Sequence, residues 1–315
     1  MTIGIAATGP WAGAGVLAGL RAVEAVGRGA IKGFVSLAVL TESQELLRAE
    51  TQDGGIKGLF ADQPPDRILS APYAALISSG PNRPTPLSQF VAAAPGVGLV
   101  TGHRFPHMAA KDGKPLNTNV LASMGSGLSA QKAVDDVIAA NPGADAGFVA
   151  LSTKGDIGWG NMPSVLRRFD HGAATRHCNE MGAVVTALHN AIHPHRAIAL
   201  LTSEVALDEM RLRETTIRTI TVSSGVELSL GERPEIHVDN ASHATRILHP
   251  EAQMLAKETS FGMGDRVRVV QVGETLGWLG HEPFMVTRNG SIFTLDGETE
   301  VKLPVHIRNV STHNS

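Results

Sequence analysis

The stretch GLSAQKAVDDVIAANPGADAGFVALSTKGDIGWGN (residues 127–161) decides the fold class. Ser129 is a typical helix N-cap, and apolar residues recur at helical spacing up to the breaker Asn141-Pro142-Gly143. The next segment predicts two strands joined by a turn at Lys154-Gly155. A helix followed directly by a hairpin indicates a mixed α/β protein.

Strands and helices also alternate on both sides of this stretch. Apolar segments bounded by Gly, Pro or polar turns predict each of them. The expected strands lie at 2–7, 34–41, 45–51, 74–77, 98–101 and 182–188, and the expected helices at 12–26, at 116–124 and after Pro194. Segments 34–41 and 45–51 form a second predicted hairpin.

The sequence changes near residue 215, where β-branched residues begin to alternate with polar ones. Strands are predicted at 216–222, 226–230 and 267–272 and around an Asn289-Gly290 hairpin, with a short amphipathic helix at 250–259. We therefore expect an α/β domain at 1–214 and a β-rich C-terminal extension or small lobe at 215–315. The sequence leaves open whether these strands form their own sheet or extend the main one.

The composition excludes several classes of protein. The chain has 315 residues, 43% of them apolar, and a net charge of −3, which excludes intrinsic disorder. Because 27 Lys and Arg are offset by 30 Asp and Glu, we expect no nucleic-acid partner. One cysteine, Cys178, no basic signal region and no apolar run of about eighteen residues indicate a cytoplasmic protein with no membrane partner. An Ala- and Gly-rich chain is compatible with a homo-oligomer.

A glycine-rich turn, TGPWAGAG (8–15), follows the first predicted strand. Its spacing fits the phosphate-binding turn of short-chain dehydrogenases, where glycines let a pyrophosphate approach a helix N-terminus. The only tyrosine, Tyr73, has no lysine four residues later, and the next segment is a predicted hairpin. Close packing of helix on strand is the alternative function of these glycines.

Two segments that contain histidine are candidates for ligand contacts. His189, His193 and His195 have a spacing that can bind a metal, but Pro194 separates two of them and no acidic residue lies nearby, so we expect polar contacts and no metal. His103 and Arg104 follow a strand end, where a basic pair can bind a carboxylate.

Two hydroxyl-bearing segments and one glycine turn are candidates for catalysis or substrate binding. Ser79-Gly80 offers a hydroxyl and a backbone amide suited to an oxyanion, and the Gly54-Gly55 turn offers further amides. Thr2 becomes the first residue if Met1 is removed, and its α-amine can then serve as the base for its own hydroxyl.

The segments from Gly98 to Asn161 and from Thr2 to Gly55 resemble the N-terminal-nucleophile (Ntn) hydrolase superfamily, in particular its glycosylasparaginase and isoaspartyl-peptidase branch. About two-thirds of the chain also resembles a bacterial family within that superfamily through its Gly-Phe-Val-Ser, Thr-Gly-His-Arg and Leu-His-Asn-Ala-Ile pieces. The resemblance implies a four-layer αββα sandwich that hydrolyses amides without a cofactor.

The chain departs from that branch at its nucleophile. Asp145 occupies the position where the branch has the threonine released by autoproteolysis, and a carboxylate cannot replace that hydroxyl. Thr2 and Ser36 remain as candidate nucleophiles, and Ser36 needs a separate base such as Lys32 or His103. Thr51 lies where the branch has a threonine lining the site.

These observations lead to one functional hypothesis and two alternatives. We expect hydrolysis of an amide in a small anionic substrate: a hydroxyl attacks the carbonyl, backbone amides near Ser79-Gly80 or Gly54-Gly55 bind the oxyanion, and His103 and Arg104 orient the substrate. The alternatives are a catalytically silent Ntn-like binding or scaffold protein and a nicotinamide-dependent oxidoreductase.

Overall fold

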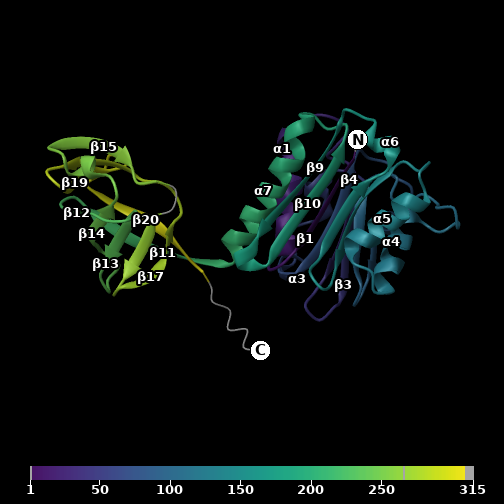
Figure 1. Cartoon of the computed structure of the whole chain (residues 1–315), viewed down its shortest axis with the longest axis horizontal. Helices are drawn as coiled ribbons and strands as arrows, with labels where there is room; N and C mark the ends of the chain where they lie inside the picture. The colour runs from purple at the N-terminus through teal and green to yellow at the C-terminus, as the bar shows by residue number, and fades with distance from the viewer. Residues whose placement is uncertain (1, 265–266, 309–315) are drawn as a thin grey trace. The chain divides into compact units, whose positions relative to one another are not determined.

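The computed structural model describes residues 2–264 and 267–308 (Figure 1). The chain forms two compact units, Met1–Arg211 and Leu212–Ser315, whereas the sequence placed the boundary after residue 214. The predicted mixed α/β class is confirmed. Among the described residues, no helix combines the length and apolar character needed to cross a membrane.

The first sheet of the first unit has six strands, and every hydrogen-bonded neighbour pair is antiparallel. In spatial order they are β3 (Leu46–Thr51), β2 (Val35–Leu40), β4 (Tyr73–Ser79), β1 (Thr2–Thr8), β10 (Ala183–Asn190) and β9 (His171–Cys178). The predicted hairpin of β2 and β3 is confirmed. Strand β9 was not predicted, because the polar sequence HGAATRHC resembles a loop.

The second sheet has four antiparallel strands. In spatial order they are β5 (Ala92–Ala94), β6 (Gly98–Arg104), β7 (Ala146–Ser152) and β8 (Ile157–Asn161). The predicted hairpin with its turn at Lys154-Gly155 is confirmed as β7 and β8.

Helices cover the outer faces of both sheets, which gives four layers, αββα (Figure 1). Helices α1 (Ala12–Val26) and α7 (His195–Arg213) cover the six-stranded sheet, and α4 (Leu116–Gly125) and α5 (Ala130–Ala140) cover the four-stranded sheet. Ser129 caps α5 as predicted, its hydroxyl accepting a hydrogen bond from the Lys132 amide. Separate apolar clusters fill the three interlayer spaces. The predicted αββα arrangement is confirmed.

Short elements complete the first unit. They are α2 (Gly55–Leu59), α3 (Asp66–Leu69), α6 (Pro163–Leu166) and the 3₁₀ turns η1 (Leu87–Phe90) and η2 (Asn179–Met181).

The second unit is a ten-stranded sheet with its own apolar core. Its strands, in spatial order, are β11 (Thr215–Ser223), β20 (Glu300–Arg308), β17 (Glu274–Leu279), β16 (Arg268–Gln271), β13 (Glu235–Val238), β14 (Ala244–His249), β12 (Glu227–Leu230), β19 (Ser291–Leu295), β18 (Phe284–Arg288) and β15 (Glu258–Gly262). The predicted Asn289-Gly290 hairpin joins β18 to β19.

One predicted helix in the second unit is wrong. Residues 250–259 form the 3₁₀ turn η3 (Ala252–Leu255) followed by the start of β15. Only Met254 of η3 is buried, and β15 pairs with β18. Strand pairing with a distant segment therefore overrides the local helical pattern.

The two sheets of the first unit approach each other closely at Gly4 of β1. A Cβ atom on Gly4 would lie 2.3 Å from the carbonyl oxygen of Gly102 in β6, so only glycine permits this separation. The contact lies beside Thr2 and His103, and it therefore fixes how far apart the sheets stand where the candidate site residues are.

We predict that Gly4→Ala lowers the free energy of unfolding by about 1–3 kcal/mol, because the added methyl group must push two backbones apart. Gly143→Ala is the matched control, since nothing lies within 4 Å of its Cβ position. Urea unfolding of the full chain measures both. Equal transition midpoints for the two variants would contradict the proposed close contact.

Candidate functional site

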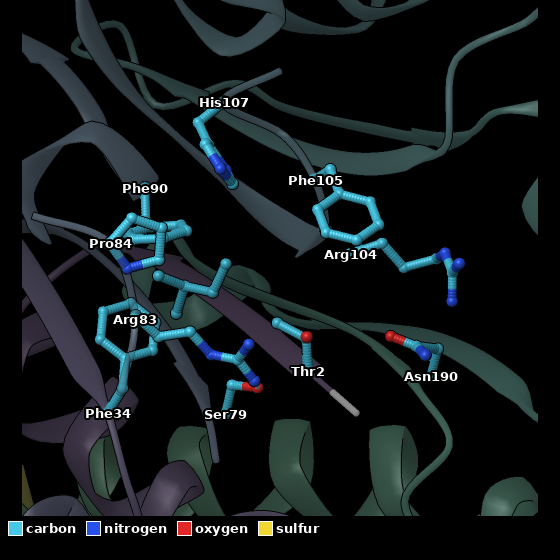
Figure 2. Close-up of a pocket in the computed structure, with 11 residues that line it drawn as sticks. Thr2, Phe34, Ser79, Arg83, Pro84, Phe90, Arg104, Phe105, His107 and Asn190 are labelled. Carbon is cyan, nitrogen blue, oxygen red and sulfur yellow. Dashed lines mark hydrogen bonds between the residues drawn. The ribbon is translucent and has the colours of Figure 1, made fainter. Parts of the chain in front are cut away.

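A cavity of about 160 Å³ opens at the end of the first sheet that carries Thr2 (Figure 2). Residues from four strands, three loops and the 3₁₀ turn η1 surround it. Its lining residues are Thr2, Phe34, Ile77, Ser79, Arg83, Pro84, Phe90, Arg104, Phe105, His107 and Asn190. Three predicted site residues, Thr2, Ser79 and Arg104, are therefore brought together.

Strand register explains the polar floor of this cavity. Thr2 pairs with Ser79 on one side and with Asn190 on the other, so the three side chains share one face of the sheet. Figure 2 shows Thr2 between the other two. Thr2 is 8% exposed, and among the described residues none forms a hydrogen bond with its hydroxyl.

Ser36 occupies a different environment. It lies on β2, separated from β1 by β4, and its side chain is fully buried. Its hydroxyl donates a hydrogen bond to Glu50 Oε1 at 3.1 Å. Ser36 is not among the residues that line the cavity, so the structure does not bring it together with Thr2.

Thr51 lies on the opposite face of the same sheet. It pairs with Val35, which pairs with Ser78, and that row packs with the helix-side core around Val35 and Ile3. The Thr51 hydroxyl donates to the carbonyl of Asp53 at 2.7 Å. Because neighbouring residues of a strand face opposite sides of the sheet, this pairing places Thr51 on the side away from the cavity.

The expected oxyanion donors already have acceptors. The Ser79 amide donates to the carbonyl of Phe34, and Gly80 does not line the cavity. The Gly55 amide donates to the carbonyl of Gly33, and the Gly54 amide donates to Asp53 Oδ1. These three amides are thus engaged in holding loops together.

The two arginines of the cavity differ in their availability. Arg104 makes a bidentate ion pair with Asp145, and this hydrogen bonding is the main cause that lowers the pKa of the Asp145 carboxyl. Arg83 donates through Nη2 to Ser79 Oγ at 2.6 Å, while its buried Nε has no partner among the described residues. Arg83 therefore retains a donor for an anionic group.

Aromatic rings form the apolar wall of the cavity. The ring of Phe90 lies 4.8 Å from that of Phe34 and 4.3 Å from that of His107. Burial lowers the pKa of His107, whose Nδ1 atom has no partner among the described residues. The wall is thus mostly apolar, with one buried ring nitrogen that no other described residue contacts.

His103 lies behind the floor of the cavity and does not line it. It is fully buried between the sheets, with Nε2 2.7 Å from Asn161 Oδ1 and Nδ1 3.3 Å from Asn190 Oδ1. Burial lowers its pKa to about 4. A neutral, enclosed imidazole cannot attract an anionic substrate, so the expected pairing of His103 with Arg104 at the substrate is not supported.

The glycine-rich turn after β1 serves packing. A Cβ on Gly13 would lie 1.7 Å from the carbonyl oxygen of Ile68, and the amides of Gly9 and Gly13 donate to the carbonyls of Pro72 and Ala71. The chain itself therefore covers this helix N-terminus, where a cofactor phosphate was the alternative.

The histidine group after β10 bonds to the backbone. His189 Nε2 lies 3.0 Å from the carbonyl oxygen of His195, and His195 Nδ1 lies 2.9 Å from that of Ile192. Across residues 2–264 and 267–308, no group of three or more His, Cys, Asp or Glu side chains is placed to hold a metal ion.

A family model described as a domain of unknown function, DUF6963, matches residues 2–219. The chain belongs to this family. A second model, described as a domain of unknown function, DUF7259, matches residues 225–300. No curated protein matches the sequence. In this DUF6963 member, every residue that lines the cavity falls within the first match.

Four polar residues of the site were not predicted from the sequence: Arg83, His107, Asn161 and Asn190. Asn190 and Asn161 end apolar strands, a position where a polar side chain is a usable signal. Arg83 and His107 lie in loops, and their convergence on Thr2 depends on how those loops pack, for which the sequence carries no local signal.

The buried imidazole of His103 predicts a loss of stability in acid. Its pKa is about 4 in the folded state against about 6.5 when unfolded, so the unfolded chain takes up the proton first. The stabilisation is complete above pH 6.5 and is lost as the pH falls toward 4. When the pH is lowered from 6.5 to 5, the free energy of unfolding of both proteins should fall. The fall should be about 1.5 kcal/mol smaller in His103→Gln than in the wild type.

Urea unfolding at pH 6.5, 6 and 5 measures this difference. His189, whose pKa burial also lowers to about 4, remains in both proteins and cancels in the comparison. Parallel pH dependences in the wild type and in His103→Gln would show that His103 does not resist protonation.

Proposed function

We propose that this protein hydrolyses an amide bond in a small anionic substrate, with Thr2 as the nucleophile after removal of Met1. One observation carries the proposal: Thr2 begins the central strand β1 and its side chain faces a cavity between two antiparallel sheets. The αββα layering supports it, because that is the architecture the Ntn resemblance implies.

The chemistry requires only the residue itself and the substrate. The α-amine of Thr2 takes the proton from Oγ1 while Oγ1 bonds to the carbonyl carbon, and the carbonyl oxygen becomes an oxyanion. When the C–N bond breaks, the ammonium returns that proton to the leaving amine. Water then attacks the resulting ester by the same route, which releases the acid and regenerates Thr2.

Thr2 is a better nucleophile candidate than Ser36 for two physical reasons. The Ser36 hydroxyl is fully buried and donates to Glu50, so a substrate carbonyl cannot reach it without a rearrangement of the sheet. Ser36 also lies inside the chain and has no α-amine, so it needs another base, and His103 faces Asn161 and Asn190 instead.

The cavity favours a small substrate that carries a carboxylate. Its volume of about 160 Å³ excludes a folded polypeptide, and its aromatic wall accommodates an apolar portion of a ligand. The unpartnered Nε of Arg83, whose Nη2 donates to Ser79 Oγ, can donate a charge-assisted hydrogen bond to an anion. The single buried cysteine, Cys178, supports a cytoplasmic location for this activity.

We predict that Thr2→Ala lowers amidase turnover by at least about 10³-fold, because the attacking oxygen is removed. Thr2→Ser keeps the hydroxyl and should retain measurable turnover, and Ser36→Ala should stay within a few-fold of the wild type. A panel of N-acyl amides, with and without a carboxylate, provides the assay. Equal residual activity in Thr2→Ala and Ser36→Ala would refute the proposal.

Intact mass spectrometry of the purified protein gives an independent check. The proposal requires an N-terminus at Thr2. A retained Met1 blocks the α-amine and would favour the silent binding or scaffold protein.

A second prediction concerns recognition of the anion. Arg83→Gln should raise KM for a carboxylate-bearing amide by about 10–100-fold, because a hydrogen bond to a charged group is lost, and should leave KM for a neutral analogue unchanged. Arg67→Gln is the matched control, since this exposed arginine pairs with Glu45 outside the cavity. Equal effects on charged and neutral amides would exclude Arg83 as the anion site.

A further inference from the structure

Three buried side chains form a continuous polar chain behind the cavity floor. Asn161 Oδ1 lies 2.7 Å from His103 Nε2, and His103 Nδ1 lies 3.3 Å from Asn190 Oδ1. Asn190 is the end of this chain that lines the cavity, where it pairs with Thr2 in the sheet. A group on the second sheet is thereby connected to the candidate nucleophile on the first.

The backbone is shaped for this chain. Gly147 of β7 pairs with His103 on one side and with Asn161 on the other, so the three residues form one row. A Cβ on Gly147 would lie 2.1 Å from Asn161 Oδ1 and 2.2 Å from His103 Nε2. The missing side chain of Gly147 leaves the space in which the imidazole and the amide meet.

The hydrogen-bonding capacity of the ring restricts how the amides can point. A neutral imidazole has one N–H donor and one acceptor nitrogen, whereas the ring nitrogens of His103 both lie next to amide oxygens. Only an imidazolium could donate to both oxygens, and full burial opposes that charge. One of the two amides must therefore present its NH₂ group to the ring.

Either amide can turn without losing another contact, because among the described residues no hydrogen bond uses the side-chain nitrogen of Asn161 or of Asn190. The two arrangements differ in which amide atom of Asn190 remains for the cavity. When Asn161 Nδ2 donates to His103 Nε2, the ring proton resides on Nδ1 and donates to Asn190 Oδ1. The NH₂ group of Asn190 then makes no hydrogen bond to the ring and can donate to a ligand in the cavity.

We propose that His103 is a positioning residue, protonated on Nδ1, which holds Asn190 with its NH₂ group toward a substrate carbonyl at Thr2. This inference rests on the proposed amide hydrolysis. It also supplies an oxyanion donor, which is needed because the amides of Ser79, Gly54 and Gly55 donate elsewhere. In the opposite arrangement, Asn190 would present an oxygen and repel the developing negative charge.

The tautomer can be measured without any substrate. Long-range ¹H–¹⁵N correlation on the ¹⁵N-histidine-labelled full chain at pH 7 distinguishes protonated from unprotonated ring nitrogens, and His103→Gln identifies the His103 signals among the 13 histidines. The expected result is a neutral ring with its proton on Nδ1. A proton on Nε2, or on both nitrogens, would overturn the proposal whatever the activity of the enzyme.

Two His103 variants then test the effect on catalysis. His103→Asn places an amide nitrogen near the position of Nδ1 and can still donate to Asn190, whereas the amide of His103→Gln reaches the position of Nε2 and contacts Asn161 instead. We expect kcat to fall by about 100-fold more in His103→Gln than in His103→Asn, the size of one lost oxyanion donor, with similar KM values.

The outcomes separate the two proposals. Equal losses of kcat in both variants, or a greater loss in His103→Asn, would show that His103 does not act through Asn190. If the wild type hydrolyses no amide, the proposed function fails, and the NMR measurement alone still decides the tautomer of His103.

Discussion

The contact between Gly4 and Gly102 determines the geometry of the first unit. A methyl group on Gly4 would collide with the carbonyl oxygen of Gly102. The two sheets are therefore so close at this point that their backbones are in direct contact, with no space for a side chain at Gly4. The candidate nucleophile lies two residues before this contact on β1, and the buried imidazole lies one residue after it on β6. The spacing of the sheets therefore becomes the spacing between these side chains.

Burial of polar groups between the sheets explains why most polar side chains near the site are paired with one another. A buried polar atom must find a partner, and Ser36, His103 and Asn161 do so with neighbouring side chains. Arg83 and His107 each retain a buried nitrogen without a partner among the described residues, and both residues line the cavity. The paired groups hold neighbouring strands together, and Arg83 and His107 are the cavity residues with a nitrogen that no other described residue contacts.

Much of the fold could be predicted from the sequence, because helix caps, glycine turns and apolar periodicity are local signals. The Ser129 cap and the hairpin around Lys154-Gly155 show this. The site was less predictable, because it depends on register and on loop packing. Thr51 and Thr2 are both threonines at strand ends, and only their pairing places them on opposite faces of one sheet. Nothing near Arg83 in the sequence indicates that it approaches Thr2.

The division of the chain into two units has a consequence for how this protein can diversify. Every lining residue of the cavity lies between positions 2 and 190, while the second unit has a core of its own and matches a separate family model. Substitutions after residue 212 therefore leave every lining residue of the cavity unchanged. The cavity and the C-terminal unit can in this sense accumulate substitutions independently, since they share neither residues nor an apolar core.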